Sequence, residues 1–371
     1  MRRLGTGRQS GIGSVGIEFE TTRARMLQLR EHRGELAVAG AARVELSEDA
    51  FIDDPRSRSA VSEQLRAAVV SGGFLGRQCV ISLPRDEVHV HGVRLPLMPT
   101  DELREAAAWE AANRLDLARE SIECDVLCMG GQPDAKERQD VLVIAAASAS
   151  LESRLDAVLE SGLRPVAVDT HFGGIARVLS RRQRRDSDAD VRAVVEVGDA
   201  GSTVLVLRGG EVAFCKLLPI GGRHLDAHIA ERLNLDIDAV GDLRLAILDA
   251  AGPSVDTATV GAVCDAARVV LAELSRDVML CLRHFAVGAR GARPERLLLT
   301  GVHARESGLA ECLETTCRLP VLLDDESQCT RAMEAGLPRL LHGTAGPASG
   351  WAIAAGLSLR GLQFGGRRRA A

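Results

Sequence analysis

The same succession of short strands and glycine turns occurs twice along this chain. The first copy begins at Val15 with VGIEFETT, RARMLQLR and LAVAGAARVEL, and Gly34 marks a turn within it. The second copy, VRAVVEVGDAGSTVLVLRGGEVAFCKLL, begins at Val191 and has Gly209 and Gly210 at a turn. Apolar residues alternate with polar ones, which predicts three antiparallel strands in the first copy and two or three strands in the second. Helical patterns follow both copies, so the duplication predicts an α/β protein of two similar lobes.

Shorter segments of different composition mark the boundaries between these parts. The run RRQRRDSDAD at 181–190 is charged and aperiodic, so we interpret it as the linker between the lobes. We expect a disordered leader at 1–13, a first lobe at 14–190 with an inserted α/β subdomain at 78–149, a second lobe at 191–360 whose end packs back toward the first, and a flexible basic tail at 361–371.

Composition excludes several classes of function. The net charge of -5 comes from 46 basic and 51 acidic residues that are spread along the chain, and there is no tyrosine, so nucleic acid is not an expected partner. Nine cysteines without a CxxC pair predict reduced thiols of a cytosolic protein and not a zinc site. The longest apolar run, VLVIAAASA at 141–149, is shorter than the roughly 20 residues that a membrane span needs. We expect a soluble cytoplasmic protein without a transmembrane segment.

Five longer runs occur in an order that resembles a known family. They are VRLPLMPTDELREAAAWEAANRL at 93–115, VLVIAAASASLESRLDAVLESGLRPVAVDTH at 141–171, LPIGGRHLDAHIAERLNL at 218–235, LAELSRDVMLCLRHF at 271–285 and AAGLSLR at 354–360. In these runs the chain is similar to the type IV pilus assembly protein PilM family, and the resemblance covers roughly residues 14 to 360. It implies a duplicated actin-like (ribonuclease H-like) two-lobe fold with an inserted α/β subdomain in the first lobe.

The resemblance also implies a nucleotide site. Actin-like ATPases hold ATP and magnesium between the lobes with two β-hairpins, where glycine and small hydroxyl residues let the backbone approach the phosphates. No catalytic residue is assigned, and Glu18 and Glu196 are the implied metal ligands. The residues implied to contact the cofactor are Glu18, Thr21, Thr22, Glu196, Gly198, Gly201, Ser202, Thr203, Gly221, Gly222 and Gly301.

The phosphate hairpins depart from the family pattern. Glu18, Phe19 and Glu20 stand where the family usually has Asp, Ile and Gly, and Glu196 stands where it has Asp. A carboxylate at Glu20 would repel a phosphate: two unit charges about 4 Å apart repel by roughly 1 kcal/mol in water and about 4 kcal/mol at an effective dielectric constant of 20. A magnesium ion between Glu18 and Glu20 would reverse that effect. Two interpretations stay open: a working ATP site, or a degenerate cleft that has little ATP turnover.

The resemblance implies a scaffold that acts through partners. PilM-like proteins hold the cytoplasmic N-terminal peptide of a PilN-like inner-membrane protein in a channel beside the inserted subdomain. The candidate partner-binding residues are Leu95, Pro96, Met98 and Trp109, although the large area of Trp109 favours core packing. A pilus motor ATPase and self-association are further expected interactions. The chain would then lie at the inner membrane through its partners, in a type IV pilus or related type II secretion complex.

Three other families share the predicted fold. A GspL-like secretion protein would carry a transmembrane helix, and an FtsA-like division protein would carry a C-terminal amphipathic helix, for which GLQFGGRRRAA is too short and rich in glycine. A sugar kinase needs a catalytic aspartate and a polar sugar pocket, and no sequence motif marks either. These remain the alternatives to a PilM-like scaffold.

Overall fold

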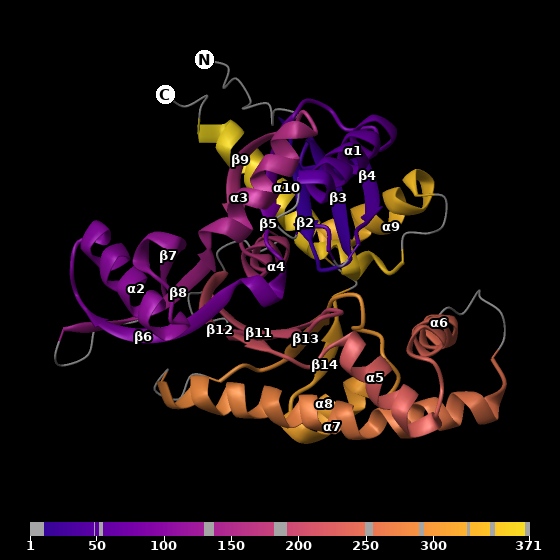
Figure 1. Cartoon of the computed structure of the whole chain (residues 1–371). Helices are drawn as coiled ribbons and strands as arrows, with labels where there is room; N and C mark the ends of the chain where they lie inside the picture. Colours follow the sequence, from indigo (N-terminus) through magenta and orange to yellow (C-terminus); the bar gives the residue numbers. More distant parts are fainter. Residues whose placement is uncertain are drawn as a thin grey trace, which may run out of the picture.

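The computed structural model of this chain contains two lobes and a smaller subdomain beside them (Figure 1). It describes residues 11–47, 49–51, 55–129, 137–181, 191–248, 255–288, 293–324, 327–341 and 346–367. Most of the predicted leader, nearly all of the predicted linker and the last residues of the predicted tail lie outside these ranges.

The first lobe is a mixed sheet with two helices on one face. Its strands are β1 (Gly11–Ile12), β2 (Val15–Phe19), β3 (Arg23–His32), β4 (Glu35–Glu45), β5 (Gln78–Ser82) and β9 (Arg164–Asp169). The order is β1-β3-β2-β5-β9, and β4 also pairs with β3. Helices α1 (Pro55–Ser71) and α3 (Ser148–Glu160) cover one face, where Ile17, Met26 and Leu65 are fully buried.

The end of the chain covers the other face of this sheet. Helix α9 (Gln328–Leu340), the short helix η3 (Ala348–Trp351) and helix α10 (Ala352–Arg367) pack on β2, β3 and β4. The backbone N–H of Leu29 donates to Ser358 Oγ at 2.9 Å, and the indole of Trp351 is fully buried between the helices and the sheet. Because α10 continues to Arg367, residues 361–367 of the predicted flexible tail are helical. Gly11 and Ile12 of the predicted leader pair with β3.

The second lobe repeats this arrangement. Its strands are β10 (Val191–Val197), β11 (Ser202–Arg208), β12 (Glu211–Leu218), β13 (Leu297–Thr300) and β14 (Val321–Leu323), in the order β12-β11-β10-β13-β14. Helices α5 (Gly222–Leu233), α6 (Ile237–Leu248), α7 (Thr257–Gly288) and α8 (Leu309–Cys317) form its helical layer. The side chains alternate along the strands: Val195 and Val204 face these helices, whereas Val194 and Leu205 pack against the first lobe.

The two sheets share one pairing pattern. In each lobe three strands run antiparallel, and two later strands add in parallel beside the first of them. The five strands β4-β3-β2-β5-β9 thus correspond to β12-β11-β10-β13-β14. The predicted duplicated α/β fold is confirmed.

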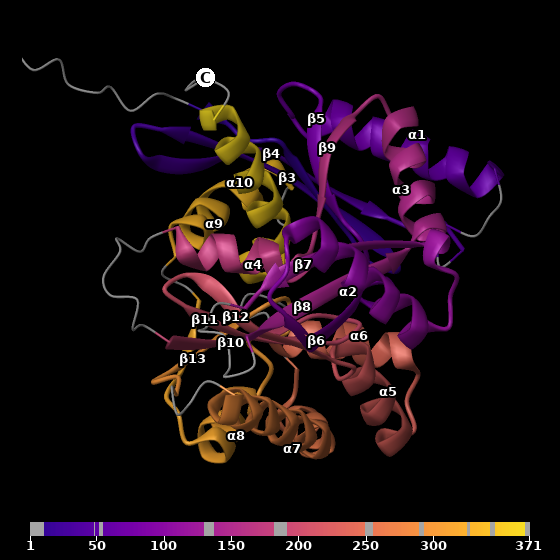
Figure 2. The same cartoon turned by 90° about the vertical axis from the view of Figure 1, so that its left-hand side faces the viewer.

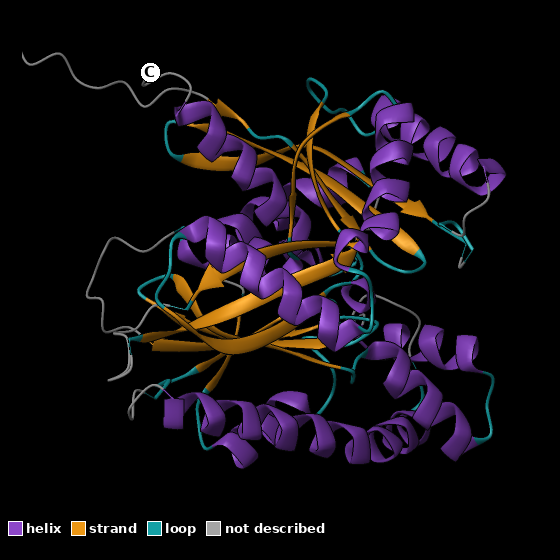
Figure 3. Ribbon diagram, turned by 60° about the vertical axis from the view of Figure 1, so that its left-hand side comes forward, coloured by secondary structure: helices purple, strands orange, loops and turns teal. Residues whose placement is uncertain are grey.

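A three-stranded sheet forms the inserted subdomain, and Figure 3 turns this side of the molecule toward the viewer. Its strands are β6 (His89–Pro96), β7 (Ile122–Cys128) and β8 (Arg138–Ala147), with β8 in the middle and β7 at an edge. The short helix η1 (Arg85–Glu87) precedes it, and η2 (Arg119–Ser121) lies within it. Strand β5, which the sequence placed inside the insertion at 78–149, pairs instead with β2 and β9 of the large sheet, because a buried apolar strand has the same pattern in either sheet.

Helix α2 (Thr100–Leu115) covers the outer face of this small sheet with alanines. Ala107 and Ala111 are buried against Val143 and Ala145, since small side chains let the helix approach the strands closely. Trp109 is on the opposite side of the helix and is 53% exposed. The core-packing interpretation of Trp109 is therefore wrong.

Helices α4 (His171–Ser180) and α10 cross at the centre of the molecule with their backbones in contact (Figure 2). A Cβ atom built at Gly356 of α10 would lie 2.0 Å from the carbonyl oxygen of Gly174 in α4. Only glycine permits this approach. The crossing therefore depends on the missing side chain at position 356.

We expect Gly356→Ala to destabilise the protein by about 3 kcal/mol, because the added methyl group must push two helix backbones apart. Gly261→Ala is the matched control, since nothing outside the neighbouring backbone of α7 lies within 4 Å of a Cβ built at this glycine. Alanine should there stabilise the helix by roughly 0.5–1 kcal/mol. Thermal unfolding followed by circular dichroism measures both. Equal midpoints for the two variants would show that the crossing tolerates a side chain.

Candidate functional site

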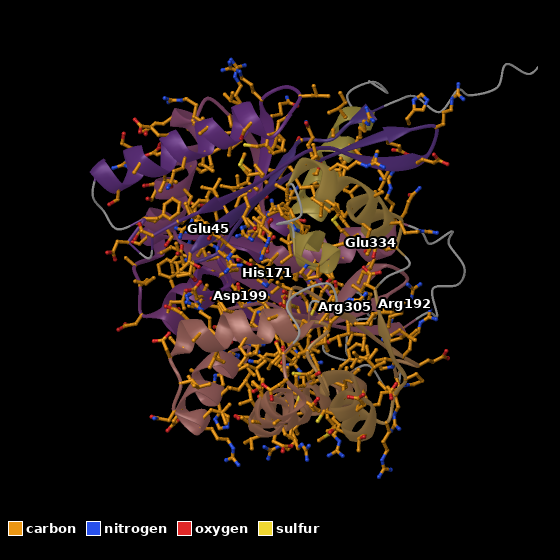
Figure 4. The ribbon with its side chains drawn as sticks, turned by 90° about the vertical axis from the view of Figure 1, so that its right-hand side faces the viewer. Glu45, His171, Arg192, Asp199, Arg305 and Glu334 are labelled. Carbon is orange, nitrogen blue, oxygen red and sulfur yellow. The ribbon has the colours of Figure 1, made fainter. Side chains whose placement is uncertain are left out.

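A cleft of about 130 Å³ lies between the two lobes, at the turns that follow β2 and β10. The loop between β5 and η1, the start of α4 and the start of α5 complete its walls. His171 and Asp199, from opposite lobes, both line it, and Figure 4 places them at the centre of the molecule. This is the cleft in which the sequence predicts the nucleotide.

The structure brings only part of the predicted nucleotide contacts to this cleft. The predicted residues that line it are Glu18, Thr21, Thr22, Glu196 and Gly198. The predicted residues outside its lining are Gly201, Ser202, Thr203, Gly221, Gly222 and Gly301. Most of this second group packs behind the hairpin: Ser202 Oγ, for example, donates to the carbonyl of Ile220 at 2.6 Å.

The N-terminus of α5 is already hydrogen-bonded within the protein. The backbone N–H of Gly222 donates to the carbonyl of Gly198 at 2.9 Å, and that of Arg223 donates to the carbonyl of Asp199 at 3.0 Å. Gly221 is wedged against the same hairpin, since its would-be Cβ would lie 2.4 Å from the nitrogen of Gly201. These helix N–H groups therefore do not point at a phosphate position.

Gly301, just after β13, allows the backbone to pass close to Val197 of β10. Its φ is +103°, and a Cβ atom there would lie 2.4 Å from the carbonyl oxygen of Val197. The next contact along the chain, from the N–H of His303 to the same carbonyl, is 3.1 Å. Gly301 thus fixes the loop after β13 against β10.

Arg85 fills the concave side of the second hairpin. Its Nη2 forms an ion pair with Glu196 and its Nη1 donates to Thr203 Oγ1, while Thr203 Oγ1 also donates to Glu196 Oε2 at 3.0 Å. Cβ atoms built at Gly198 and Gly201 would lie 3.4 Å from Nη2 and 3.2 Å from Cδ of this arginine. The space that the hairpin glycines leave is therefore taken by a side chain of the protein.

Arg85 is not among the site residues that the sequence predicts. The position of Arg85 offered one signal. Arg85 lies just beyond the carboxyl end of β5, a buried strand that is parallel to its neighbours. Residues beyond the carboxyl ends of parallel strands in α/β sheets gather at ligand clefts.

The first hairpin carries its own counter-charges. Arg25 Nη1 lies 2.5 Å from Glu20 Oε1 and 3.8 Å from Glu18 Oε1. Arg23 lies 3.4 Å from Glu20 and reaches across the cleft to Asp199 at 3.3 Å. Glu20 does line the cleft, as its sequence position predicts, but it is an ion-paired carboxylate and not an isolated one.

Several buried polar atoms face the same small cavity. Glu18 Oε2, Ser82 Oγ and both ring nitrogens of His171 have no hydrogen-bond partner among the described residues. Burial raises the pKa of Glu18 to about 8, and the charge of Arg25 opposes this shift only in part. Burial, together with the charge of Arg85, holds the pKa of His171 well below its usual range. Burial thus favours the uncharged form of both side chains, and a cavity of this polarity suits ordered water.

A second buried network borders the far side of the cleft. His303 Nε2 lies 2.5 Å from Asp199 Oδ1, and the imidazole covers Gly222. Arg244 donates to Glu306 at 2.7 Å and to the carbonyl of Gly222 at 3.1 Å, and it also forms an ion pair with Asp226. Burial acts to raise the pKa of Asp199, but the hydrogen bond from His303 and the charge of Arg23 outweigh it and hold that pKa well below its usual range.

A larger groove of about 680 Å³ lies on the other side of α4, between the inserted subdomain and both lobes. Strand β7, the turn between β11 and β12, helix α4 and the middle of α10 line it. Leu83, Val88, Ile144, Leu151 and Phe172 supply apolar wall. None of the described positions Leu95, Pro96, Met98 and Trp109 belongs to its lining.

The sequence of this two-lobe protein matches a known protein family. A family model described as "Type IV pilus assembly protein PilM" matches residues 16–362. The chain belongs to the PilM family. This match favours PilM over the GspL-like, FtsA-like and sugar-kinase alternatives.

Solved structures show the same fold. A PilM–PilN type IV pilus biogenesis complex is 22% identical, with a TM-score of 0.74, over 94% of this chain and 98% of that chain. EutJ, an ethanolamine utilization protein from Carboxydothermus hydrogenoformans, is 12% identical with a TM-score of 0.54 over 95% and 91% of the two chains. MreB5 of Spiroplasma citri bound to ADP is 8% identical with a TM-score of 0.52 over 98% and 100%. The actin-like fold predicted from the sequence is confirmed.

The cleft of this PilM-family chain does not fit a nucleoside triphosphate as its residues lie. Its volume of about 130 Å³ is below the roughly 300–1,000 Å³ of typical ligand pockets. Arg85 occupies the hairpin that the resemblance assigns to phosphate, and its carboxylate partner Glu196 is the implied metal ligand. Among the residues described, no group of three or more His, Cys, Asp or Glu side chains could hold a metal ion. Glu196 is paired with Arg85 and so does not present a free carboxylate to a metal ion in this arrangement. Magnesium at Glu18 and Glu196 stays a prediction from the family resemblance.

The raised pKa of Glu18 predicts a pH effect on stability. The folded chain keeps this proton up to about pH 8, whereas an unfolded chain releases it near the ordinary glutamate pKa of 4.5. The unfolded state therefore gains stability relative to the folded state as pH rises through this window. We expect Glu18→Gln, which mimics the protonated form, to remove this pH dependence. The free energy of unfolding of this variant should then exceed that of the wild type by about 1–4 kcal/mol at pH 8.

Thermal midpoints of both proteins between pH 5 and pH 8 measure the effect. Glu102→Gln is the control, because Glu102 is exposed on α2. Parallel pH profiles for Glu18→Gln and the wild type would mean that Glu18 ionises in the ordinary range.

Proposed function

We propose that this chain is a scaffold of a type IV pilus (or related type II secretion) assembly complex, and that it binds the cytoplasmic N-terminal peptide of a PilN-like membrane protein. Membership of the PilM family supports the scaffold role. The groove beside strand β7 is the observation that carries the peptide proposal, because it joins an apolar trough to a strand edge.

The edge position of β7 suits an extended peptide. In the described sheet β7 pairs with β8 on one side only, and residues 123–127 of this edge strand line the groove. An extended peptide can add to such an edge through main-chain hydrogen bonds, while pockets receive its alternate side chains. The similar structure of a complex between PilM and PilN supports this class of partner.

The two walls of the groove differ in chemistry. Leu83, Val88 and Leu151 give apolar surface near the inserted subdomain. Across from them, Asp169 at the end of β9 pairs with Arg177 of α4 and with Arg360 of α10, the latter at 2.5 Å. This ion cluster ties three elements of the first lobe together beneath the groove. A peptide would therefore bind over a floor that is already fixed, which lowers the entropy cost of ordering the groove on binding.

Attachment to the inner membrane would come through that partner. Among the helices in the described parts of the chain, none combines the length and the apolar character that crossing a bilayer requires. A bound membrane-protein tail would hold the chain at the cytoplasmic surface. A pilus motor ATPase and self-association remain predictions from the family resemblance.

Binding of ATP and magnesium in the cleft is the alternative to a cleft that only joins the lobes. Relatives in fold include MreB5 bound to ADP and to AMPPNP, so the fold is compatible with a nucleotide. In this chain most of the charged groups of the cleft pair with one another. We therefore propose a scaffold whose cleft joins the lobes, and we assign it no hydrolytic step.

Leu127→Arg tests the groove, and Trp109→Ala tests the outer face of α2 that the sequence selected. Leu127 lines the groove from β7 and is half-buried. A long charged side chain there should weaken binding of a labelled PilN N-terminal peptide at least tenfold, about 1.4 kcal/mol. We expect Trp109→Ala to change the affinity less than twofold. Fluorescence anisotropy measures binding, and circular dichroism confirms that both variants fold.

The reverse result has a clear meaning. If Trp109→Ala lost binding and Leu127→Arg kept it, the peptide would bind on the outer face of the inserted subdomain, with Leu95, Pro96 and Met98. If neither variant lost binding, the peptide site would lie elsewhere on the chain.

A further inference from the structure

We propose that Arg85 closes the interlobe cleft from within and holds the two lobes together without a nucleotide. The side chain starts from η1, which follows β5 of the first lobe. Its partners Glu196 and Thr203 lie on β10 and β11 of the second lobe. One arginine thus joins the lobes at the hairpin that the family resemblance assigns to phosphate.

Geometry and burial make this contact a strong one. The guanidinium uses two nitrogens on two acceptors, and a planar fork suits such two-point binding. The side chains of Arg85 and Glu196 are only 13% and 4% exposed, so solvent screens their attraction weakly. Thr203 also donates to Glu196, which fixes the carboxylate toward the arginine.

Two further contacts cross the cleft beside Arg85. Arg23 of the first lobe lies 3.3 Å from Asp199 of the second, and Asp199 is itself held by His303. Arg223 of the second lobe donates to Thr21 of the first at 3.3 Å. The contact of Arg85 with Glu196 and Thr203 is therefore the most buried of these three polar contacts across the cleft.

A phosphate could enter only by displacing Arg85. Displacement would leave Glu196 buried without its cation, and a buried charge that loses its partner is strongly destabilising. The incoming phosphate would also face the carboxylates of Glu20 and Asp199. Because Arg85 is part of the chain, it competes at a high effective concentration. The cleft thus favours its own arginine over a nucleotide.

This inference goes beyond the peptide scaffold and does not depend on it. In the duplicated fold, a bridging ligand between hairpins joins the lobes. Here the bridging group is a side chain, so lobe closure is a fixed property of the sequence. The groove beside β7 would form whether or not ATP is present.

Small-angle X-ray scattering and isothermal titration with ATP and magnesium test the proposal on the full chain. The variant is Arg85→Ala. Arg119→Ala is the control, because Arg119 forms a 3.1 Å pair with Glu105 inside the inserted subdomain, away from the cleft. We expect the wild-type and Arg119→Ala radii of gyration to be equal and unchanged by ATP. We expect Arg85→Ala to give a larger radius and to bind ATP at least tenfold more tightly than the wild type.

Each other outcome overturns one of the two parts of the proposal, which are lobe closure by Arg85 and exclusion of the nucleotide by Arg85. If wild-type scattering contracts on adding ATP, or if Arg85→Ala scatters like the wild type, Arg85 does not hold the lobes. If Arg85→Ala binds ATP no more tightly, Arg85 does not exclude the nucleotide; weaker binding would make it a phosphate ligand. Should Arg85→Ala fail to fold, Arg85→Lys replaces it, since lysine keeps the charge and loses the fork. An intermediate radius and affinity support the proposal, and wild-type values for both refute it.

Discussion

The crossing of α4 and α10 is the contact on which the other parts depend. Its two backbones touch at Gly174 and Gly356, so α4 lies deep between the lobes. From there α4 sends His171 into the small cleft and Phe172 and Arg177 into the groove. Its apolar face also packs on the inner face of the second sheet, against Val194 and Leu205. One helix of ten residues thus forms a wall of both cavities and the main apolar contact between the lobes.

The charges of the cleft are compensated locally and in pairs. Glu20 has Arg25 and Arg23, Glu196 has Arg85, and the carboxylates around α5 share Arg244. Breaking one buried pair typically costs about 3–5 kcal/mol, since the remaining charge is left without a partner. Of the substitutions toward the family's Asp-Ile-Gly pattern, Glu20→Gly alone would therefore leave Arg25 without its main partner.

Local patterns predicted the duplicated architecture well. Alternating apolar residues and glycine turns specify hairpins within a few residues, so the antiparallel strands of both lobes could be read from the sequence. Membership of a sheet is less local: the apolar pattern of β5 fits the inserted sheet and the large sheet equally, and only its pairing with β2 and β9 decides. The exposure of Trp109 follows from the alanine face of α2, which the sequence shows but whose direction depends on the sheet beneath it.

The site was predicted only in part for the same reason. Residues adjacent in the hairpins, such as Glu18, Thr21 and Gly198, do line the cleft. The ion pair of Arg85 with Glu196 joins positions 111 residues apart, and no periodicity or motif signals such a contact. The groove beside β7 likewise takes its lining from segments spread between Leu83 and Arg360.

The return of the chain end to the first lobe has a consequence for biosynthesis. Leu29 and Ser358, which share a hydrogen bond, are 329 residues apart, and α9 and α10 supply one whole apolar layer of the first sheet. During translation the first strands leave the ribosome long before that layer exists. The second lobe, whose core comes from one continuous stretch of sequence, can complete its fold earlier. The lobe that is made first is therefore finished last, and until then one apolar face of its sheet is open to chaperones and to other nascent chains.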